Sequence, residues 1–316
     1  YFRSHFVIKP TMFDAFVNTM KKSHIAKQSA KKAVAHAQQN AAKLEQTAQD
    51  ILTKSGADAK VSCRVKSVDS TASKQIRYLK DFDTYENKRN DVLNIILGSG
   101  MREIIGDSYG MRFIYNAEKT KGKDTAKLIY DTMLDYAKNK KDFSVSVIEN
   151  YFGNGIKPYA DNSVMQNFAK LTYKNPRGQI CHTTSVNAPK KSGYTRTNTS
   201  ANIFGVNTEI QGGGKLTTLW GDVEHFLYDV RMGKSPDLSK LTDEQKIIAK
   251  SIINDYKALT ANNKQHEVFN KEYLSKIWGS LRKSEIKGLD TPELPAFPQG
   301  FPDTLRAENI MKLAHV

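Results

Sequence analysis

The stretch that decides the fold reads Asp107-Ser108-Tyr109-Gly110-Met111-Arg112-Phe113-Ile114-Tyr115. Its aromatic and aliphatic side chains predict a core strand over residues 109–115. Asp107 stands just before this strand, and an acidic residue at such a sheet edge can hold Mg²⁺ against a phosphate. Arg112, further along the strand, can lie against the same ligand. A turn aspartate and an arginine on a solvated strand face would give the same pattern, so both interpretations stay open.

Periodic patterns on either side of this strand predict further strands that alternate with helices. Strands are expected at 60–65, 143–148, 196–204 and 206–211. Helices are expected at 11–55, 70–82, 89–105, 124–139, 161–170, 216–231 and 304–314, with two more within 242–284. Apart from its one helix, the segment 151–190 lacks a regular period, and four prolines exclude regular structure over 292–302.

These elements predict an α+β fold with a mixed β-sheet of about five strands flanked by helices. We expect a helical N-terminal extension over residues 1–56, a central domain over 57–232 and a helical C-terminal extension over 233–316. The N-terminal helix is rich in alanine and lysine, so it is expected to cover the core rather than to form it.

The composition narrows the function classes. The 316 residues include 48 Lys and Arg against 33 Asp and Glu, a net charge of +15. This surplus favours polyanionic partners such as nucleotides or nucleic acid, although a lysine-rich solubilising surface would also explain it. Two cysteines are too few for a disulfide scaffold or a cysteine zinc site. We expect no membrane span and no signal peptide. Because residue 1 is not Met, the chain is compatible with a piece of a longer protein.

A basic cluster follows the strand expected at 60–65. Arg64 and Lys66 are two residues apart and share a strand face. Ser70, Lys74 and Arg77 recur at helical spacing and share a helix face. Four cations and a hydroxyl near a helix N-terminus suit a triphosphate. A basic helix with a solvated face is the alternative.

A polar hairpin is predicted further along the chain. Gly193 and Tyr194 precede a strand, where the glycine would let the backbone turn and expose the ring for stacking on a base. Glu209 and Gln211 share a face of the next strand. A carboxylate there can bind a metal ion or accept a proton from a hydroxyl. A β-hairpin with polar edges would look the same.

The helix expected at 216–231 carries a stripe formed by Trp220, Glu224 and Tyr228 at spacings of four. Glu224 and His225 are adjacent, which is not the spacing of a helical metal pair. We expect a structural role here, with core packing and a buried acid–base pair.

Together, over residues 50–232, these pieces resemble the synthetase domain of the RelA/SpoT family, the makers of the alarmones pppGpp and ppGpp. The order and the internal spacing of the family's motifs agree. The matching positions are Arg64, Lys66, Ser70, Lys74, Arg77, Asp107, Gly110, Arg112, Gly193, Tyr194, Glu209, Gln211, Trp220, Glu224 and His225. The resemblance implies a nucleotidyltransferase-like core.

The resemblance also implies roles on the side of the ATP donor. Arg64 and Arg112 would sandwich the adenine. The ATP phosphates would be held by Arg64, Lys66, Lys74 and Arg77, with Ser70 alongside.

For the acceptor side, the resemblance implies that Asp107 and Glu209 bind Mg²⁺, and that Glu209 also activates the acceptor hydroxyl. Tyr194 would stack on the acceptor base, with Gln211 and Asn198 as further acceptor-binding residues.

Three departures from the family pattern lie on the acceptor side. Asn198 stands where the family usually has His, and Gly212-Gly213-Gly214 stands where it has Ile-Arg-Thr. The long segment 151–190 replaces a compact loop. The sequence has no His-Asp dipeptide, so the family's hydrolase domain is not expected, and the residues after 232 do not resemble its regulatory domains.

The expected activity is therefore Mg²⁺-dependent transfer of pyrophosphate from ATP to the 3′-hydroxyl of a purine nucleotide, giving ppGpp, pppGpp, ppApp or pppApp. An RNA acceptor such as the 3′ end of tRNA is an alternative that the net charge favours. A non-catalytic nucleotide- or RNA-binding module is another, but it would require loss of Asp107 or Glu209, and both are present. Because a synthetase without a hydrolase is toxic when unrestrained, a toxin is compatible with the sequence. The expected compartment is a bacterial cytoplasm, or the cytosol of a target cell.

Overall fold

The computed structural model describes residues 24–73, 108–151, 162–174, 180–187, 193–233, 235–236, 238–239 and 241–314. The helix expected at 89–105 lies outside these residues, as does the beginning of the helix expected at 11–55. Three expected donor or metal residues also lie outside them: Lys74, Arg77 and Asp107.

Six strands form one mixed sheet in the order β1-β2-β10-β9-β5-β8. They are β1 (Ala59–Val65), β2 (Tyr109–Tyr115), β5 (Phe143–Asn150), β8 (Thr184–Asn187), β9 (Thr197–Ile203) and β10 (Val206–Gly214). The pairs β2–β10 and β5–β8 are parallel, and the other neighbours are antiparallel. This arrangement confirms the predicted α+β fold with a mixed sheet, and it confirms the five expected strands to within a few residues.

The sixth strand corrects the expectation for 151–190. Within this segment, β8 pairs with β5, and β6 (Thr172–Lys174) and β7 (Ile180–His182) form a separate hairpin. The sequence of β8 is short and polar, so its own pattern does not predict a strand. Its partner β5 supplies the backbone hydrogen bonds, which is a tertiary effect that overrides local preference.

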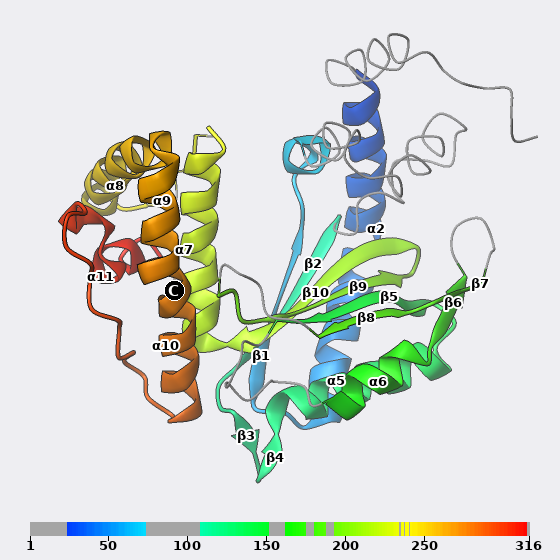
Figure 1. Cartoon of the computed structure of the whole chain (residues 1–316). Coiled ribbons are helices and arrows are strands. Elements are labelled where there is room, and N and C mark those ends of the chain that lie inside the picture. The colour runs from blue at the N-terminus through cyan, green and yellow to red at the C-terminus, as the bar shows by residue number, and fades with distance from the viewer. Residues whose placement is uncertain are drawn as a thin grey trace, which may run out of the picture.

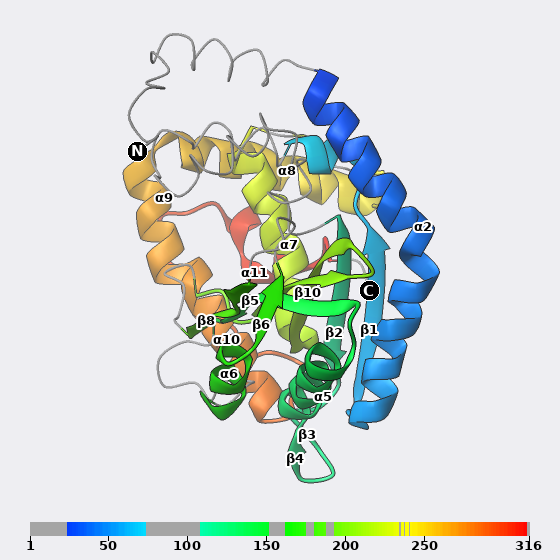
Figure 2. The same ribbon diagram turned by 90° about the vertical axis from the view of Figure 1, so that its right-hand side faces the viewer.

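Three helices cover one face of the sheet (Figures 1 and 2). They are α2 (His24–Ser55), α5 (Thr125–Asn139) and α6 (Asn162–Ala169). Leu44 of α2, Met133 of α5 and Phe168 of α6 belong to the same buried cluster as Phe113 and Ile210 of the central strands. Helix α2 also contributes fully buried alanines, so it forms part of the core, and the expectation that it would only cover the core is wrong.

The opposite face of the sheet is polar. Residues in β2, β9 and β10 alternate between buried and partly exposed positions, because successive side chains of a strand point to opposite faces. The partly exposed positions of these strands include Gly110, Arg112, Asn198, Ser200, Glu209 and Gln211. The candidate site is built on this face.

The C-terminal helices form a second core on one side of the sheet (Figure 1). They are α7 (Lys215–Arg231), α8 (Asp243–Ala261), α9 (Asn263–Phe269), the π-helical turn η3 (Asn270–Leu274), α10 (Ser275–Ile286), the 3-10 turn η4 (Asp303–Leu305) and α11 (Ala307–Met311). Residues 292–302 have no regular structure, as predicted, and Phe297 and Phe301 of this segment pack against Phe269. Among the described helices, none is long and apolar enough to cross a membrane.

A buried ionic cluster attaches α10 to the sheet. Arg282 of α10 is 1% exposed and pairs with Glu118, which follows β2, and with Glu285 of its own helix. Glu285 also accepts hydrogen bonds from the backbone N and the hydroxyl of Thr217, in the first turn of α7. Strand, α7 and α10 are therefore fixed relative to one another close to the polar face. The expected boundaries at residues 56 and 232 stay predictions.

Candidate functional site

The register of the sheet places the predicted site residues in two neighbouring rows across the strands. One row runs Arg64, Gly110, Glu209 and Ser200, from β1 through β2 and β10 to β9. The next row runs Ser62, Arg112, Gln211, Asn198 and Glu149, from β1 through to β5. Residues that are far apart in the sequence thus share one polar surface.

Arg64 and Glu209 lie on this surface on either side of a glycine. The side chain of Arg64 crosses Gly110, since a Cβ atom at position 110 would lie 3.6 Å from the Cγ of Arg64. With a strand spacing of about 4.8 Å, the Cα atoms of Arg64 and Glu209 are about 10 Å apart. Within the described part of the chain, neither side chain forms a salt bridge or a side-chain hydrogen bond. A cation and a carboxylate without such partners among the described residues therefore lie in one row on the polar face.

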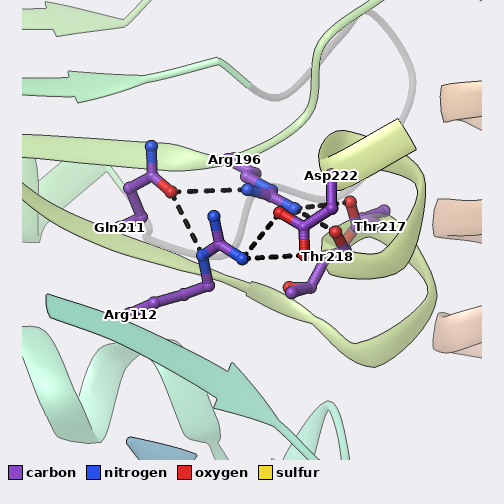
Figure 3. Close-up of polar contacts among 6 residues, drawn as sticks. All are labelled: Arg112, Arg196, Gln211, Thr217, Thr218 and Asp222. Carbon is purple, nitrogen blue, oxygen red and sulfur yellow. Dashed lines mark hydrogen bonds and ion pairs between the residues drawn. The ribbon is translucent and has the colours of Figure 1, made fainter. Parts of the chain in front are cut away.

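The second row is held by a network that includes helix α7 (Figure 3). Arg112 donates from Nη1 to both carboxylate oxygens of Asp222, at 2.8 and 3.0 Å, and from Nε to Oε1 of Gln211 at 3.3 Å. The guanidinium of Arg112 is thus oriented by one residue of α7 and one of β10. Its expected contact with adenine stays a prediction.

A second arginine, directly before β9, reaches the same glutamine. Arg196, which is 3% exposed, donates from Nη1 to Oε1 of Gln211 at 3.4 Å. Its Nη2 donates to the backbone oxygens of Thr217 and Thr218 at 2.8 and 2.7 Å. Burial lowers the pKa of Arg196, and the nearby charge of Arg112 lowers it further.

The ring of Tyr194 packs against two other aromatic side chains. Its ring makes edge contacts with Trp278 of α10 and with Tyr151, at centroid distances of 5.1 and 5.8 Å. Its hydroxyl donates to Oδ1 of Asn198 at 3.1 Å. Burial raises the pKa of Tyr194, and the charge of nearby Glu209 also raises it. The ring is partly exposed, and its stacking role stays a prediction.

Gly193 turns the backbone, as expected, and it also makes room for helix α10. It adopts φ +79°, and a Cβ atom there would lie 2.3 Å from the backbone oxygen of Ser275 in α10. Glycine is needed because α10 packs directly on the backbone at this point. The C-terminal helices, which the sequence did not connect with the site, thus form one of its walls.

The rest of the donor motif is described in part. Lys66 follows β1, and its backbone N donates to the oxygen of Ser108 at 3.1 Å. Ser70 lies exposed in a helical segment, 68–73, and its backbone N donates to the hydroxyl of Ser67, which caps the start of that helix. Lys66 and Ser70 are therefore close to the end of β1 that carries Arg64, as the motif predicts.

The described residues also allow a limited test of the Mg²⁺ site. Glu209 offers a partly exposed carboxylate, a ligand that Mg²⁺ prefers, and its small neighbours in the row, Gly110 and Ser200, leave room beside it. Ser108, the residue after Asp107, donates to the backbone oxygen of Asn207 on β10. No group of three or more His, Cys, Asp or Glu side chains gathers within the described residues. Glu209 fits one ligand of the expected pair, and the pair itself stays a prediction.

The Glu-His dipeptide of α7 differs from its prediction in one respect. Glu224 accepts a hydrogen bond from Nε1 of Trp278 at 3.1 Å, which confirms a structural role between α7 and α10. His225 is 71% exposed and lies 4.0 Å from Asp229. The prediction of a buried pair between Glu224 and His225 is therefore wrong, because adjacent helical residues point in different directions.

Sequence reasoning missed Arg196 and Asp222. Arg196 lies directly before β9 and two residues before Asn198, so strand alternation places it on the polar face but does not predict the partners that its side chain reaches. Asp222 lies between the noted residues Trp220 and Glu224 without a motif of its own. The only sequence signals are glycines at 213 and 221, which make space for the Arg196 side chain.

Comparisons with known proteins give distant similarities. No family model and no curated protein matches the chain. Among solved structures, the chain is similar to small alarmone synthetase 1 from Bacillus subtilis, at 13% identity and a TM-score of 0.35, over 75% of this chain and 95% of that one. It is also similar to the structure of that enzyme bound to its product pppGpp, at 15% identity and a TM-score of 0.32, over 80% of this chain and 98% of that one.

Proposed function

We propose that this chain is a pyrophosphokinase that transfers the β,γ-pyrophosphate of ATP to the 3′-hydroxyl of a purine nucleotide. The observation that carries the proposal is the row formed by Arg64, Gly110 and Glu209 on the polar face. A cation for the phosphates and a carboxylate for the attacking hydroxyl stand on one rigid surface, separated by a residue without a side chain.

The proposed reaction needs positioning and charge neutralisation more than covalent help from the protein. The 3′-oxygen of the acceptor attacks the β-phosphorus of ATP and forms a new P–O bond. The bond from that phosphorus to the oxygen bridging the α- and β-phosphates breaks, and AMP leaves with the electron pair. Glu209 takes the proton of the hydroxyl. A Mg²⁺ ion held by Glu209, with Asp107 as the expected second ligand, would neutralise phosphate charge.

The direct test is transfer of label from ATP that carries ³²P in its γ-phosphate. The protein is incubated separately with GDP, GTP, ADP, ATP and total tRNA, and products are resolved by chromatography and by gel. The proposal expects labelled nucleotide together with an equal amount of AMP. Label on tRNA instead would show an RNA acceptor, which the net charge of +15 favours. Release of inorganic phosphate alone, or no reaction with any acceptor, contradicts the proposal.

A matched pair of variants tests the donor side. Arg64→Ala removes the cation next to Gly110, whereas Lys60→Ala removes an exposed cation from the same face of β1, opposite Ile114. Losing a cation that pairs with phosphate in a desolvated site costs about 2–5 kcal/mol. Arg64→Ala should therefore lose most of its ATP affinity or turnover, and Lys60→Ala should keep both. Equal behaviour of the two variants would show that Arg64 is merely a solvated cation.

A further inference from the structure

We propose that Arg196 is a positioning residue of the transfer site, which fixes the amide oxygen of Gln211 and thereby directs the NH₂ group of Gln211 toward the acceptor. The inference rests on the proposed function for the identity of the acceptor. It extends that function, because nothing in the resemblance assigns a role to Arg196.

The first observation is the space made for Arg196. A Cβ atom at Gly221 of α7 would lie 2.4 Å from Nη2 of Arg196, and one at Gly213 of β10 would lie 3.3 Å from its Cγ. Both glycines are needed for the side chain to pass between strand and helix. The guanidinium then lies against the bare backbone of α7, and its Nη2 reaches the oxygens of Thr217 and Thr218.

The second observation is that two arginines share one hydrogen-bond acceptor. Arg112 of β2 and Arg196, just before β9, donate to the same atom, Oε1 of Gln211. An amide turned the other way would face two donor groups with its own NH₂. The two guanidinium groups therefore determine which end of the amide points outward. Figure 3 shows the amide nitrogen of Gln211 pointing away from both arginines.

The third observation is the charge of the cluster. Among the described residues, Asp222 is the carboxylate that forms a salt bridge with Arg112, and no carboxylate forms one with Arg196. The cluster therefore keeps a net positive charge behind Gln211. Such a charge favours an electron-rich group in front of the amide. The outward NH₂ of Gln211 would donate to an oxygen of the acceptor nucleotide, from a phosphate, the ribose or the base.

The structural support for Arg196 also explains why it can act through Gln211 without touching the substrate. The arginine is buried, it is bonded to main-chain atoms, and its guanidinium lies 5.9 Å from the centre of the Trp278 ring. A shift of α7 or α10 would move Arg196 and, with it, Gln211. The arginine thus couples the C-terminal helices to the orientation of one acceptor-binding side chain.

Three variants test the inference, with Arg231→Lys as an exposed control on α7. Arg196→Lys keeps the charge but cannot donate to Gln211 and to α7 together. Gly221→Ala displaces the guanidinium without changing Arg196 or Gln211. Gln211→Glu keeps an oxygen that accepts hydrogen bonds from both arginines, but it removes the NH₂ group that points outward. Thermal unfolding and circular dichroism identify the variants that fold.

For folded Arg196→Lys, Gly221→Ala and Gln211→Glu, we expect the acceptor kcat/KM to fall about 100-fold, the usual cost of misplacing a group by about 1 Å. The Kd for ATP should change far less than the acceptor kcat/KM, since Arg64 lies on β1, outside the cluster, and Arg112 keeps its pair with Asp222. Arg231→Lys should behave as wild type. If Arg196 had a merely structural role, the variants would have a lower unfolding temperature, and the acceptor kcat/KM and the affinity for ATP would change to a similar extent. Wild-type acceptor kinetics in Gly221→Ala or in Gln211→Glu would overturn the inference.

A second readout separates this inference from the proposed function. The side-chain NH₂ signals of Gln211 in a ¹⁵N spectrum are identified by their loss in Gln211→Glu. We expect one sharp pair in the wild type, and a shifted or broadened pair in Arg196→Lys and Gly221→Ala. An unchanged pair would overturn the inference even if the enzyme transfers pyrophosphate. Conversely, a wild type that transfers to no acceptor contradicts the proposed function, while the spectra still decide whether Arg196 fixes the amide.

Discussion

Gly221 of helix α7 lies so close to Arg196, the residue before strand β9, that a Cβ atom at position 221 would stand 2.4 Å from the Nη2 of the arginine. The glycine is in a helix, where alanine would normally be the better residue. The contact joins the polar face of the sheet to the helix that follows β10. It therefore links the stability of the fold with the geometry of the candidate site.

The first prediction concerns this contact. Gly→Ala in a helix interior normally stabilises a protein by about 1 kcal/mol. Here we expect Gly221→Ala to lower the free energy of unfolding by about 1–3 kcal/mol, because the new methyl group meets a buried side chain that cannot move freely. The measurement is urea unfolding followed by circular dichroism.

A double-mutant cycle supplies the control for Gly221→Ala. In the Arg196→Ala background, the methyl group meets no guanidinium, so the same glycine substitution should be neutral or stabilising. If Gly221→Ala destabilises both backgrounds equally, the strain does not come from Arg196.

The second prediction concerns the ionic cluster that attaches α10. Arg282→Met should lower the free energy of unfolding by about 3–5 kcal/mol, because Glu118 and Glu285 would lose their buried cation. Lys287→Met is the matched control, since Lys287 follows the same helix and its pair with Glu293 is 55% and 70% exposed. Exposed pairs contribute about 0–1 kcal/mol. Similar losses in both variants would contradict a specific role of the buried cluster.

The third prediction concerns alkaline pH. Burial raises the pKa of Tyr130 to about 12, whereas an unfolded tyrosine titrates near about 10. Between these values the folded state keeps a proton that the unfolded state has lost, so stability must fall as the pH rises. The contribution of Tyr130 is fully present below about pH 10 and is lost as the pH passes about 12.

Tyr130→Phe tests this origin of the pH dependence. Urea unfolding at several pH values should give a shallower loss of stability for the variant than for the wild type between about pH 10 and about pH 12. The variant also loses the contact of the Tyr130 hydroxyl with Thr197. This loss gives a stability difference between variant and wild type that is constant below about pH 10. Parallel curves throughout would show that Tyr130 does not contribute.

Much of the polar face could be predicted from the sequence. Arg112, Glu209 and Gln211 alternate with buried residues in strands, and an alternating pattern fixes the shared face without knowledge of the fold. The strand 109–115 was predicted with its observed bounds because its composition leaves no alternative element. Asp107 lies outside the described residues, so its metal role stays a prediction.

The features of the site that the sequence does not predict depend on contacts between segments that are distant in the chain. Asp222 meets Arg112 because α7 packs beside the sheet, and Trp278 meets Tyr194 because α10 packs beside α7. A local pattern carries no signal for such packing. The glycines at 213 and 221 are signals of close approach, but the sequence does not say what approaches them.

The most direct test of the central claim is label transfer by Glu209→Gln beside the wild type, with ATP binding measured on the same preparations. Asn202→Ala, a polar residue on the same face of β9, is the control. The account predicts that the wild type and Asn202→Ala transfer pyrophosphate to an acceptor, whereas Glu209→Gln binds ATP with wild-type affinity and transfers none, because it lacks the carboxylate that accepts the hydroxyl proton. Wild-type turnover by Glu209→Gln, or no transfer by the wild type to any acceptor, would contradict it.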